Sequence, residues 1–262
     1  MPGRLISVHE NRQIITTKPR KPFYKLADIF KFKQFDVNQS GCAMKVNTDG
    51  VLLGALANAE GASTVLDIGT GTGVIALMLA QRFPNANIEA VEIDAAAAET
   101  ADGNFKTSQF ADRLQLYATA FEEYFEACPD KQFDFIVSNP PFFLNSLASP
   151  GEKKNLARHT DGAFFEKLIG SVARHLKPAG TCAMILPLET ADMVKGLLVE
   201  DGMHLLGIVD IKSFEHTAPH REIITFGGQP TALQRTELII YAEPKVYSQA
   251  YQHTLKEFLT IF

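Results

Sequence analysis

The sequence predicts an α/β protein with a mostly parallel β-sheet that is covered by helices on both faces. Short apolar segments rich in β-branched residues alternate with longer segments of helical spacing, which is the pattern of βαβ units. The 262 residues suffice for one large domain, and an apolar fraction of 46% with a charged fraction of 21% is typical of globular proteins. The sequence contains no internal repeat and no low-complexity segment.

Each expected strand is a short segment in which apolar residues dominate or alternate with polar ones. Thr64–Ile68 is almost continuously apolar and ends at Gly69, whereas residues 113–117 alternate as in a half-buried strand. The expected strands cover residues 64–68, 87–94, 113–117, 133–138, 181–186, 204–211 and 237–242.

The expected helices lie mostly between these strands. The segment from Val74 is long enough for a helix and ends near Pro84, because proline cannot continue it. Apolar residues recur at helical spacing from Phe164 to Leu176, just before Pro178. The other expected helices are an Ala-rich one over 95–106, one over 189–200, and one that begins at Thr48 and Asp49.

The first 45 residues differ in charge from the rest of the chain. They hold nine Lys or Arg and three acidic residues, although the whole chain has a net charge of −5. We expect residues 1–30 to form a basic, flexible arm and residues 31–262 to form a single domain. Such an arm either faces a nucleic acid or is simply solvated.

The composition disfavours several other classes of protein. No segment reaches 18 uncharged apolar residues, so no transmembrane helix is expected, and the first residues lack the apolar core of a secretory signal. Cys42, Cys128 and Cys182 are odd in number and far apart, which fits neither a disulfide framework nor a zinc ribbon. The histidines are scattered. A cytoplasmic protein without a metal site is therefore expected.

A glycine-rich turn follows the first strand of the expected sheet. It carries Gly69, Gly71 and Gly73. A dinucleotide fingerprint would need its third glycine at position 74, which is Val74. Asp67 before the turn would repel a pyrophosphate but suits a cationic amino-acid head, and Glu92 after the next strand can accept hydrogen bonds from ribose hydroxyls. Together these residues indicate S-adenosylmethionine.

Two prolines and two aromatic residues follow the strand 133–138. The prolines fix the turn and present Asn139 rigidly. The side-chain oxygen of Asn139 and the carbonyl of Pro140 can accept hydrogen bonds from an exocyclic NH₂ and so direct its lone pair at a methyl sulfonium. Phe142 offers a face on which a planar base or amide can stack. We expect Asn139, Pro140 and Phe142 to be catalytic, with Asn139 also bordering the donor and Phe142 and Phe143 binding the substrate.

These motifs resemble those of the class I methyltransferases, specifically the amino-group methylators with an Asn-Pro-Pro-aromatic motif. The resemblance covers about residues 45–245. It implies a Rossmann-like three-layer sandwich around a seven-stranded sheet with one antiparallel strand, and a methyl donor that lies across the first two strands.

A narrower resemblance comes from Met-Lys-Val-Asn-Thr-Asp-Gly-Val-Leu-Leu-Gly-Ala at residues 44–55. This segment looks like the one that introduces the bacterial valine tRNA adenine-N6-methyltransferases, which act on the adenine 3′ to the anticodon. Residues 35–39, 157–159 and 237–241 fit the same family. The resemblance implies that Lys45, Thr48 and Asp49 contact the donor, although Thr48 and Asp49 could instead only cap their own helix.

The chain departs from this family at two positions. Many relatives have Tyr where this chain has Phe142, so stacking would be kept without the hydroxyl. Relatives often carry an Asp that contacts the donor adenine where this chain has Ala120, and the backbone of Phe121 is expected to serve instead. Arg158 lies in an expected loop that could meet an RNA phosphate or simply be mobile. Arg221 could bind a phosphate, although an ion pair on a strand is favoured.

The expected function is S-adenosylmethionine-dependent methylation of the N6 amine of an adenine in tRNA. Rival substrates are a guanine N2 in ribosomal RNA and a glutamine amide in a release factor, because both are served by Asn-Pro-Pro-aromatic enzymes. A non-catalytic RNA-binding protein that keeps the fold is the alternative from another class. Intact Asp67, Glu92 and Asn139 argue against that alternative.

Overall fold

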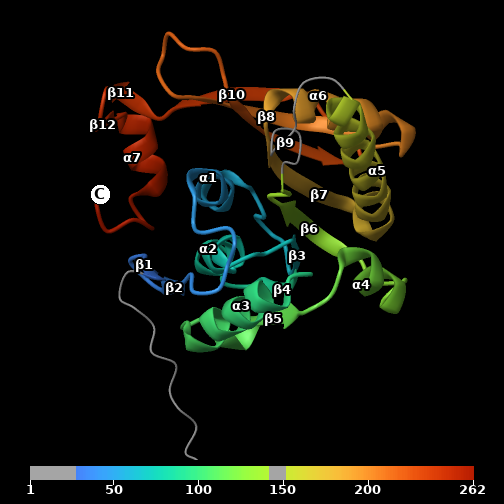
Figure 1. Ribbon diagram of the computed structural model, residues 1–262, viewed down its shortest axis with the longest axis horizontal. Coiled ribbons are helices and arrows are strands. Elements are labelled where there is room, and N and C mark those ends of the chain that lie inside the picture. The colour runs from blue at the N-terminus through green and yellow to red at the C-terminus, as the bar shows by residue number, and fades with distance from the viewer. Residues whose placement is uncertain (1–27, 142–151) are drawn as a thin grey trace, which may run out of the picture.

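An eight-stranded β-sheet runs through the molecule (Figure 1). In the computed structural model, which describes residues 28–141 and 152–262, the strand order is β10-β8-β9-β7-β6-β3-β4-β5. Strand β9 is antiparallel to both of its neighbours, and the other neighbouring pairs are parallel. The mostly parallel sheet with one antiparallel strand is thus confirmed, but it has eight strands where seven were expected.

The additional strand has a simple origin. All seven segments expected to be strands are present, and they include β10 (Gln234–Ile239), which pairs with β8 at the edge of the sheet. Strand β9 (Arg221–Gly227), the antiparallel one, is the eighth. The remaining strands are β3 (Thr64–Ile68), β4 (Asn87–Val91), β5 (Leu114–Tyr117), β6 (Phe133–Ser138), β7 (Leu176–Leu186) and β8 (His204–Lys212).

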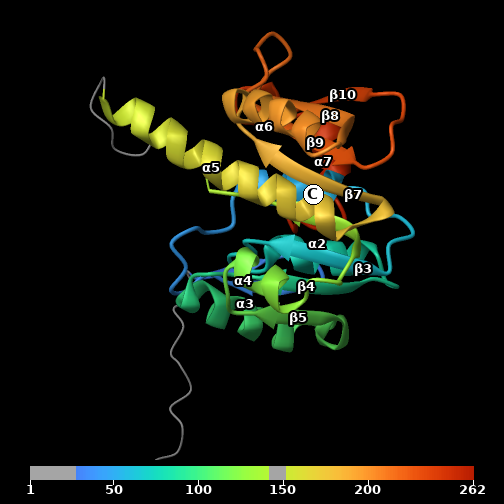
Figure 2. The same ribbon diagram turned by 90° about the vertical axis from the view of Figure 1, so that its right-hand side faces the viewer.

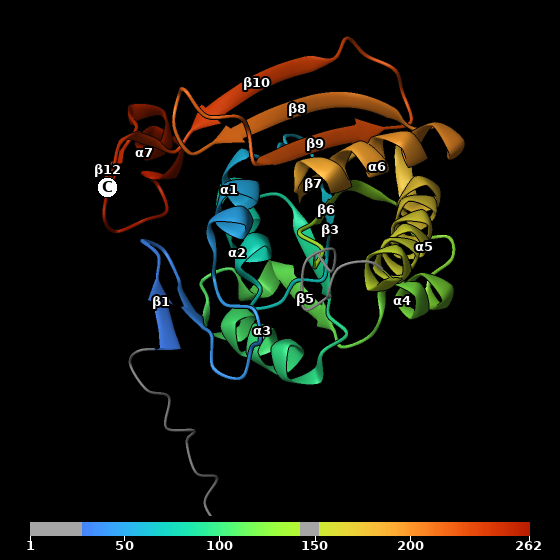
Figure 3. The same ribbon diagram turned by 45° about the horizontal axis from the view of Figure 1, so that its top comes forward.

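Helices cover both faces of the sheet, so the expected three layers are present. On one face lie α1 (Thr48–Leu56), α2 (Val74–Arg82), α3 (Ala95–Thr107) and α7 (Gln249–Leu255) (Figure 3). On the other face lie α4 (Phe121–Ala127), α5 (Glu152–His175) and α6 (Leu188–Glu200). Successive residues of β6 alternate between the two layers, with Phe135 and Val137 in one core and Ile136 in the other.

Two short hairpins lie outside the main sheet. One is β1 (Ile29–Lys31) with β2 (Asp36–Asn38), and the other is β11 (Tyr241–Glu243) with β12 (Val246–Tyr247). Phe32, just after β1, forms a bridge to Leu259, so the first hairpin packs near the end of the chain. Of the expected basic arm, residues 1–27 lie outside the described residues.

Helix α5 begins earlier than expected. The stretch 151–158 was interpreted as a loop, but the chain is helical from Glu152, and the amino end of α5 reaches beyond the other helices (Figure 2). After Gly151 the stretch contains neither glycine nor proline, and Glu, Lys, Leu, Ala and Arg all favour a helix. No helix in the described part of the chain is both long and apolar enough to span a membrane.

Candidate functional site

The two motifs of the sequence meet at the carboxyl edge of the sheet. Strands β3 and β6 are neighbours, with Ile68 opposite Ser138. The buried Ser138 hydroxyl donates to the carbonyl oxygen of Ile68 at 2.8 Å, which fixes the two strand ends together. The glycine-rich turn and Asn139 therefore start side by side, where parallel α/β sheets bind ligands.

A cavity of about 440 Å³ opens between these two segments. It is lined by seven of the expected site residues: Gly69, Gly71, Glu92, Ala120, Phe121, Asn139 and Pro140. Its lining is mainly apolar with a few polar groups, as in most small-molecule sites. The size and lining suit a ligand with both polar and planar apolar parts.

The three glycines of the turn have different roles. All three have positive φ angles, of 71°, 57° and 83° for Gly69, Gly71 and Gly73. No atom lies within 4 Å of a Cβ built on Gly69 or Gly71, so a ligand can approach their backbone closely. A Cβ on Gly73 would lie 2.5 Å from the Cε1 atom of Phe105. Gly73 is thus needed for packing against α3, and it does not line the cavity.

Glu92 binds the glycine-rich turn directly. Its Oε2 accepts a hydrogen bond from the backbone N–H of Gly71 at 2.8 Å, and its Oε1 accepts one from Asp94 at 2.9 Å. A carboxylate oxygen can accept more than one hydrogen bond, so Glu92 keeps capacity for ligand hydroxyls. The acid expected to hold a ribose also shapes the turn.

Asp67 lies below the surface of the cavity. It is fully buried, and its Oδ2 accepts a hydrogen bond from the Thr70 hydroxyl at 2.6 Å. Its Oδ1 is buried without a hydrogen-bond partner. Burial raises the pKa of Asp67 to about 7, although the Thr70 hydroxyl opposes this shift. Asp67 therefore supports the turn from beneath and is not among the residues that line the cavity.

The amino end of α1 lies beside Asn139. A Cβ built on Gly50 would lie 3.8 Å from the Asn139 Nδ2 atom. The cap of α1 is Asn47, whose Oδ1 accepts from the Gly50 N–H at 2.9 Å, so the alternative that Thr48 and Asp49 only cap their own helix is wrong.

The other charged groups near α1 are paired. Asp49 accepts from Arg221 at 2.9 Å, and this is the ion pair that the sequence favoured for Arg221. Lys45 is exposed and lies 3.9 Å from Asp28. Lys45, Thr48 and Asp49 are not among the residues that line the cavity, so their expected contact with the donor stays a prediction.

Sequence reasoning missed several residues that line the cavity. Ile93 is 75% exposed immediately after Glu92, and Phe164 packs edge-on against Phe121 with ring centroids 5.9 Å apart. Cys42–Met44 come from the segment before α1. Ile93 was interpreted as part of a strand and Phe164 as helix core. No local pattern marked Cys42–Met44.

Some expected residues cannot be placed in the site. Phe142 and Phe143 lie outside the described residues, and Arg158 is described only as a helical position of α5. Among the residues that the structure does describe, no group of three or more His, Cys, Asp or Glu is placed to hold a metal ion.

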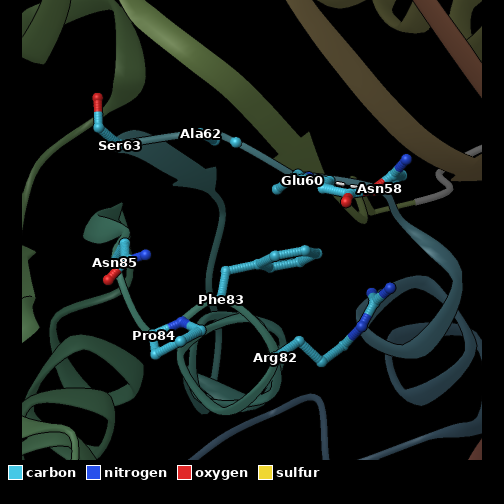
Figure 4. Close-up of a pocket in the computed structure, with 10 residues that line it drawn as sticks. Asn58, Glu60, Ala62, Ser63, Arg82, Phe83, Pro84 and Asn85 are labelled. Atoms are coloured by element: carbon cyan, nitrogen blue, oxygen red, sulfur yellow. Dashed lines mark hydrogen bonds between the residues drawn. The ribbon is translucent and has the colours of Figure 1, made fainter.

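A second cavity, of about 580 Å³, lies at the opposite edge of the sheet, before β3 and β4 begin. Figure 4 shows Arg82, Phe83 and Asn85 around it. The Arg82 guanidinium donates to the backbone carbonyl of Gly54 at 3.0 Å and also to that of Ala57. This cation serves the fold, so the cavity at the carboxyl edge is the stronger candidate.

The chain is similar to known methyltransferases. Residues 47–188 match the family model of the methyltransferase small domain. The chain is 46% identical over 239 residues to a tRNA1(Val) (adenine(37)-N6)-methyltransferase of Pedobacter heparinus, covering 90% of this chain and all of that protein. It is 44% identical over 230 residues to the protein of the same name in Bacteroides thetaiotaomicron, covering 87% of this chain and 96% of that protein.

A solved structure supports the fold. The crystal structure of a predicted O-methyltransferase from Agrobacterium tumefaciens superposes with a TM-score of 0.64 at 18% sequence identity. The match covers 80% of this chain and 96% of that protein. At this identity the likeness concerns the arrangement of strands and helices alone.

Proposed function

The chain belongs to the methyltransferase small domain family and, within it, to the tRNA1(Val) (adenine(37)-N6)-methyltransferases, and we propose that its carboxyl-edge cavity brings S-adenosylmethionine and an adenine of valine tRNA together. The fold is that of the class I methyltransferases. The reaction is methylation of the exocyclic N6 amine of an adenine in tRNA. The target is the adenine on the 3′ side of the anticodon.

The cavity fits a methyl donor of this kind. When bound, S-adenosylmethionine supplies an electrophilic methyl group on its sulfonium. Gly69 and Gly71 leave open space for close approach of a ligand, and Glu92 has acceptor capacity for ribose hydroxyls. Ile93 and Phe121 present apolar surface for a planar ring. Ala120 and Phe121 also line the cavity, and the backbone of Phe121 is proposed to contact the donor adenine.

Asn139 and Pro140 are proposed to hold the target amine. The side-chain oxygen of Asn139 and the carbonyl oxygen of Pro140 would accept hydrogen bonds from the two N6–H groups. This would leave the nitrogen lone pair free to attack the methyl carbon as the bond from that carbon to the donor sulfur breaks. Pro140 is buried, and Gly50 lies beside the half-buried Asn139. Catalysis then comes mainly from orientation, and the amine loses a proton to solvent after the transfer.

The observation that carries this proposal is the pairing of Ile68 with Ser138. It places the glycine-rich turn and the proposed amine-binding residues in one cavity.

The proposal is tested by incubating the purified protein with tritiated S-adenosylmethionine and an unmodified valine tRNA transcript. We expect mass spectrometry of the nucleosides to show N6-methyladenosine, and an adenine-to-guanine change at position 37 of the tRNA to abolish it. Preferential methylation of ribosomal RNA or of a release factor would favour the rival substrates. Binding of tRNA without any methyl transfer would favour the non-catalytic alternative.

A further inference from the structure

Asn104 of α3 joins two segments that border the carboxyl-edge cavity. Asn104 is 97% buried, and its side chain makes three hydrogen bonds to backbone groups. Its Oδ1 accepts from the N–H of Asn38 at 2.9 Å, and its Nδ2 donates to the carbonyl of Asn38 at 2.9 Å and to that of Thr72 at 2.8 Å. One planar amide therefore holds the end of β2 and the glycine-rich turn at a fixed separation.

The Thr72 end of this connection leads into the proposed donor site. Thr72 lies between Gly71, which lines the cavity, and Gly73, which packs on α3. The turn is thus held from two sides, by Glu92 at the N–H of Gly71 and by Asn104 at the carbonyl of Thr72. A shift of Asn104 would move one side of the turn relative to the other.

The Asn38 end of the connection leads to another part of the cavity wall. Cys42–Met44 line the cavity only a few residues after Asn38. The intervening chain is braced by the Ser40 N–H, which donates to Asn38 Oδ1 at 3.0 Å, and by Gln39, whose Oε1 accepts from the Val46 N–H at 2.8 Å. Because this segment is internally fixed, a displacement at Asn38 is passed on to Cys42–Met44.

We infer that Asn104 is a positioning residue for the methyl donor, setting the separation between the glycine-rich turn and the Cys42–Met44 wall. Asparagine is suited to this task because one acceptor and two donors are needed in a single plane. An aspartate would lack the donors and would set its charge against two carbonyl oxygens. The inference rests on the proposed donor site, and it adds that the segment before α1 belongs to that site.

Variants at Asn104 test this inference. For Asn104→Ala we expect a rise of tenfold or more in the donor Kd by calorimetry and in the donor KM. At saturating donor, kcat should stay within threefold of the unchanged protein. Asn104→Asp should not rescue donor affinity, because it restores the acceptor alone.

The matched control is Ser108→Ala, at the residue that follows α3. The Ser108 hydroxyl donates to the carbonyl of Phe105 at 2.8 Å and contacts neither wall of the cavity. It should lower the Tm while leaving the donor Kd within twofold. An Asn104→Ala protein with an unchanged donor Kd, or one whose Kd rises no more than that of Ser108→Ala, would overturn the inference.

Hydrogen exchange of the unaltered protein provides a test that needs no variant. Adding S-adenosylmethionine should slow amide exchange at residues 69–73 and also at residues 38–46. Slowing at 69–73 alone would overturn the role of Asn104 while leaving the donor site intact. If the unaltered protein binds no S-adenosylmethionine at all, the proposed donor site itself fails, and the inference fails with it.

Discussion

Arg221 at the start of β9 donates from its Nε to Oδ2 of Asp49, 2.9 Å away in the first turn of α1. The pair connects the antiparallel strand β9 to α1. Gly50, which follows Asp49 in α1, lies beside Asn139. Both charged side chains are partly exposed, so the pair contributes only about 0–1 kcal/mol to stability. Its larger effect is to restrain α1 next to the proposed amine-binding residue.

We therefore expect Asp49→Arg and Arg221→Asp each to reduce kcat severalfold with a small change in Tm. The double variant restores an ion pair with reversed polarity, so it should recover part of the lost turnover. Steady-state kinetics of the four proteins form a double-mutant cycle. Strictly additive losses would show that the two side chains act independently.

Asn139→Ala should reduce turnover far more than it weakens donor binding, because Asn139 is proposed to contact the target amine. We expect kcat to fall by a factor of about 100 or more, in line with the contribution of precise orientation. The donor Kd, measured by calorimetry, should stay within about threefold. Full activity in Asn139→Ala would rule out amine positioning by this side chain.

Glu92→Ala should weaken donor binding by about 1–3 kcal/mol, because the Gly71 and Asp94 N–H groups and the ribose hydroxyls all lose an acceptor. Glu92→Gln keeps one acceptor oxygen and should fall between Glu92→Ala and the unchanged protein. Calorimetric titration with S-adenosylmethionine measures both effects. The exposed Glu99 of α3 provides a control, since Glu99→Ala should leave the affinity unchanged.

Asp67 should make the stability of the ligand-free protein depend on pH. Burial raises its pKa to about 7, so the folded state favours the neutral acid. The stabilising contribution is complete below the unfolded pKa of about 4 and is lost as the pH rises through 7. A difference of about three pKa units corresponds to at most roughly 4 kcal/mol.

Urea unfolding at several pH values measures this contribution. Between pH 5 and 8, the unaltered protein should lose free energy of unfolding relative to Asp67→Asn, which does not titrate. If the two proteins keep a constant difference across this range, Asp67 ionises normally in the fold.

Gly73→Ala and Gly71→Ala should have different consequences. Alanine at position 73 would place its Cβ 2.5 Å from the Phe105 ring at a φ of 83°, so we expect a loss of stability of about 2 kcal/mol or more. Alanine at position 71 meets no atom within 4 Å and should cost about 1–2 kcal/mol from its φ alone. Its main effect should be on donor affinity. Thermal unfolding and calorimetry together separate the two cases.

The features of the site that could be predicted are those that depend only on where one strand ends. The Asp67 turn and Asn139 each directly follow an apolar strand, so their place at the carboxyl edge follows from the parallel sheet. Ile93, Phe164 and Cys42–Met44 could not be predicted, because their place in the cavity depends on packing between distant segments. The role of Asn104 could not be predicted for the same reason, since its hydrogen-bond partners lie 32 and 66 residues away in sequence.

The errors at helix ends have local causes. Asn47 rather than Thr48 caps α1, since all three residue types at 47–49 are good caps and sequence cannot choose among them. The composition of residues 151–158 was interpreted as that of a loop. Most residue types after Gly151 favour a helix, however, and α5 begins at Glu152.

The outer strand β10 also determines how the sheet meets the solvent. Without β10, the long strand β8 would expose a row of unpaired backbone groups to which another sheet could add. The side chains of Gln234–Glu237 are exposed, and Arg235 is tied back to Asp210 by two hydrogen bonds. A short, charged outer strand is a poor template for pairing with a second chain. Removing β10 should therefore turn an edge that resists aggregation into one that promotes it.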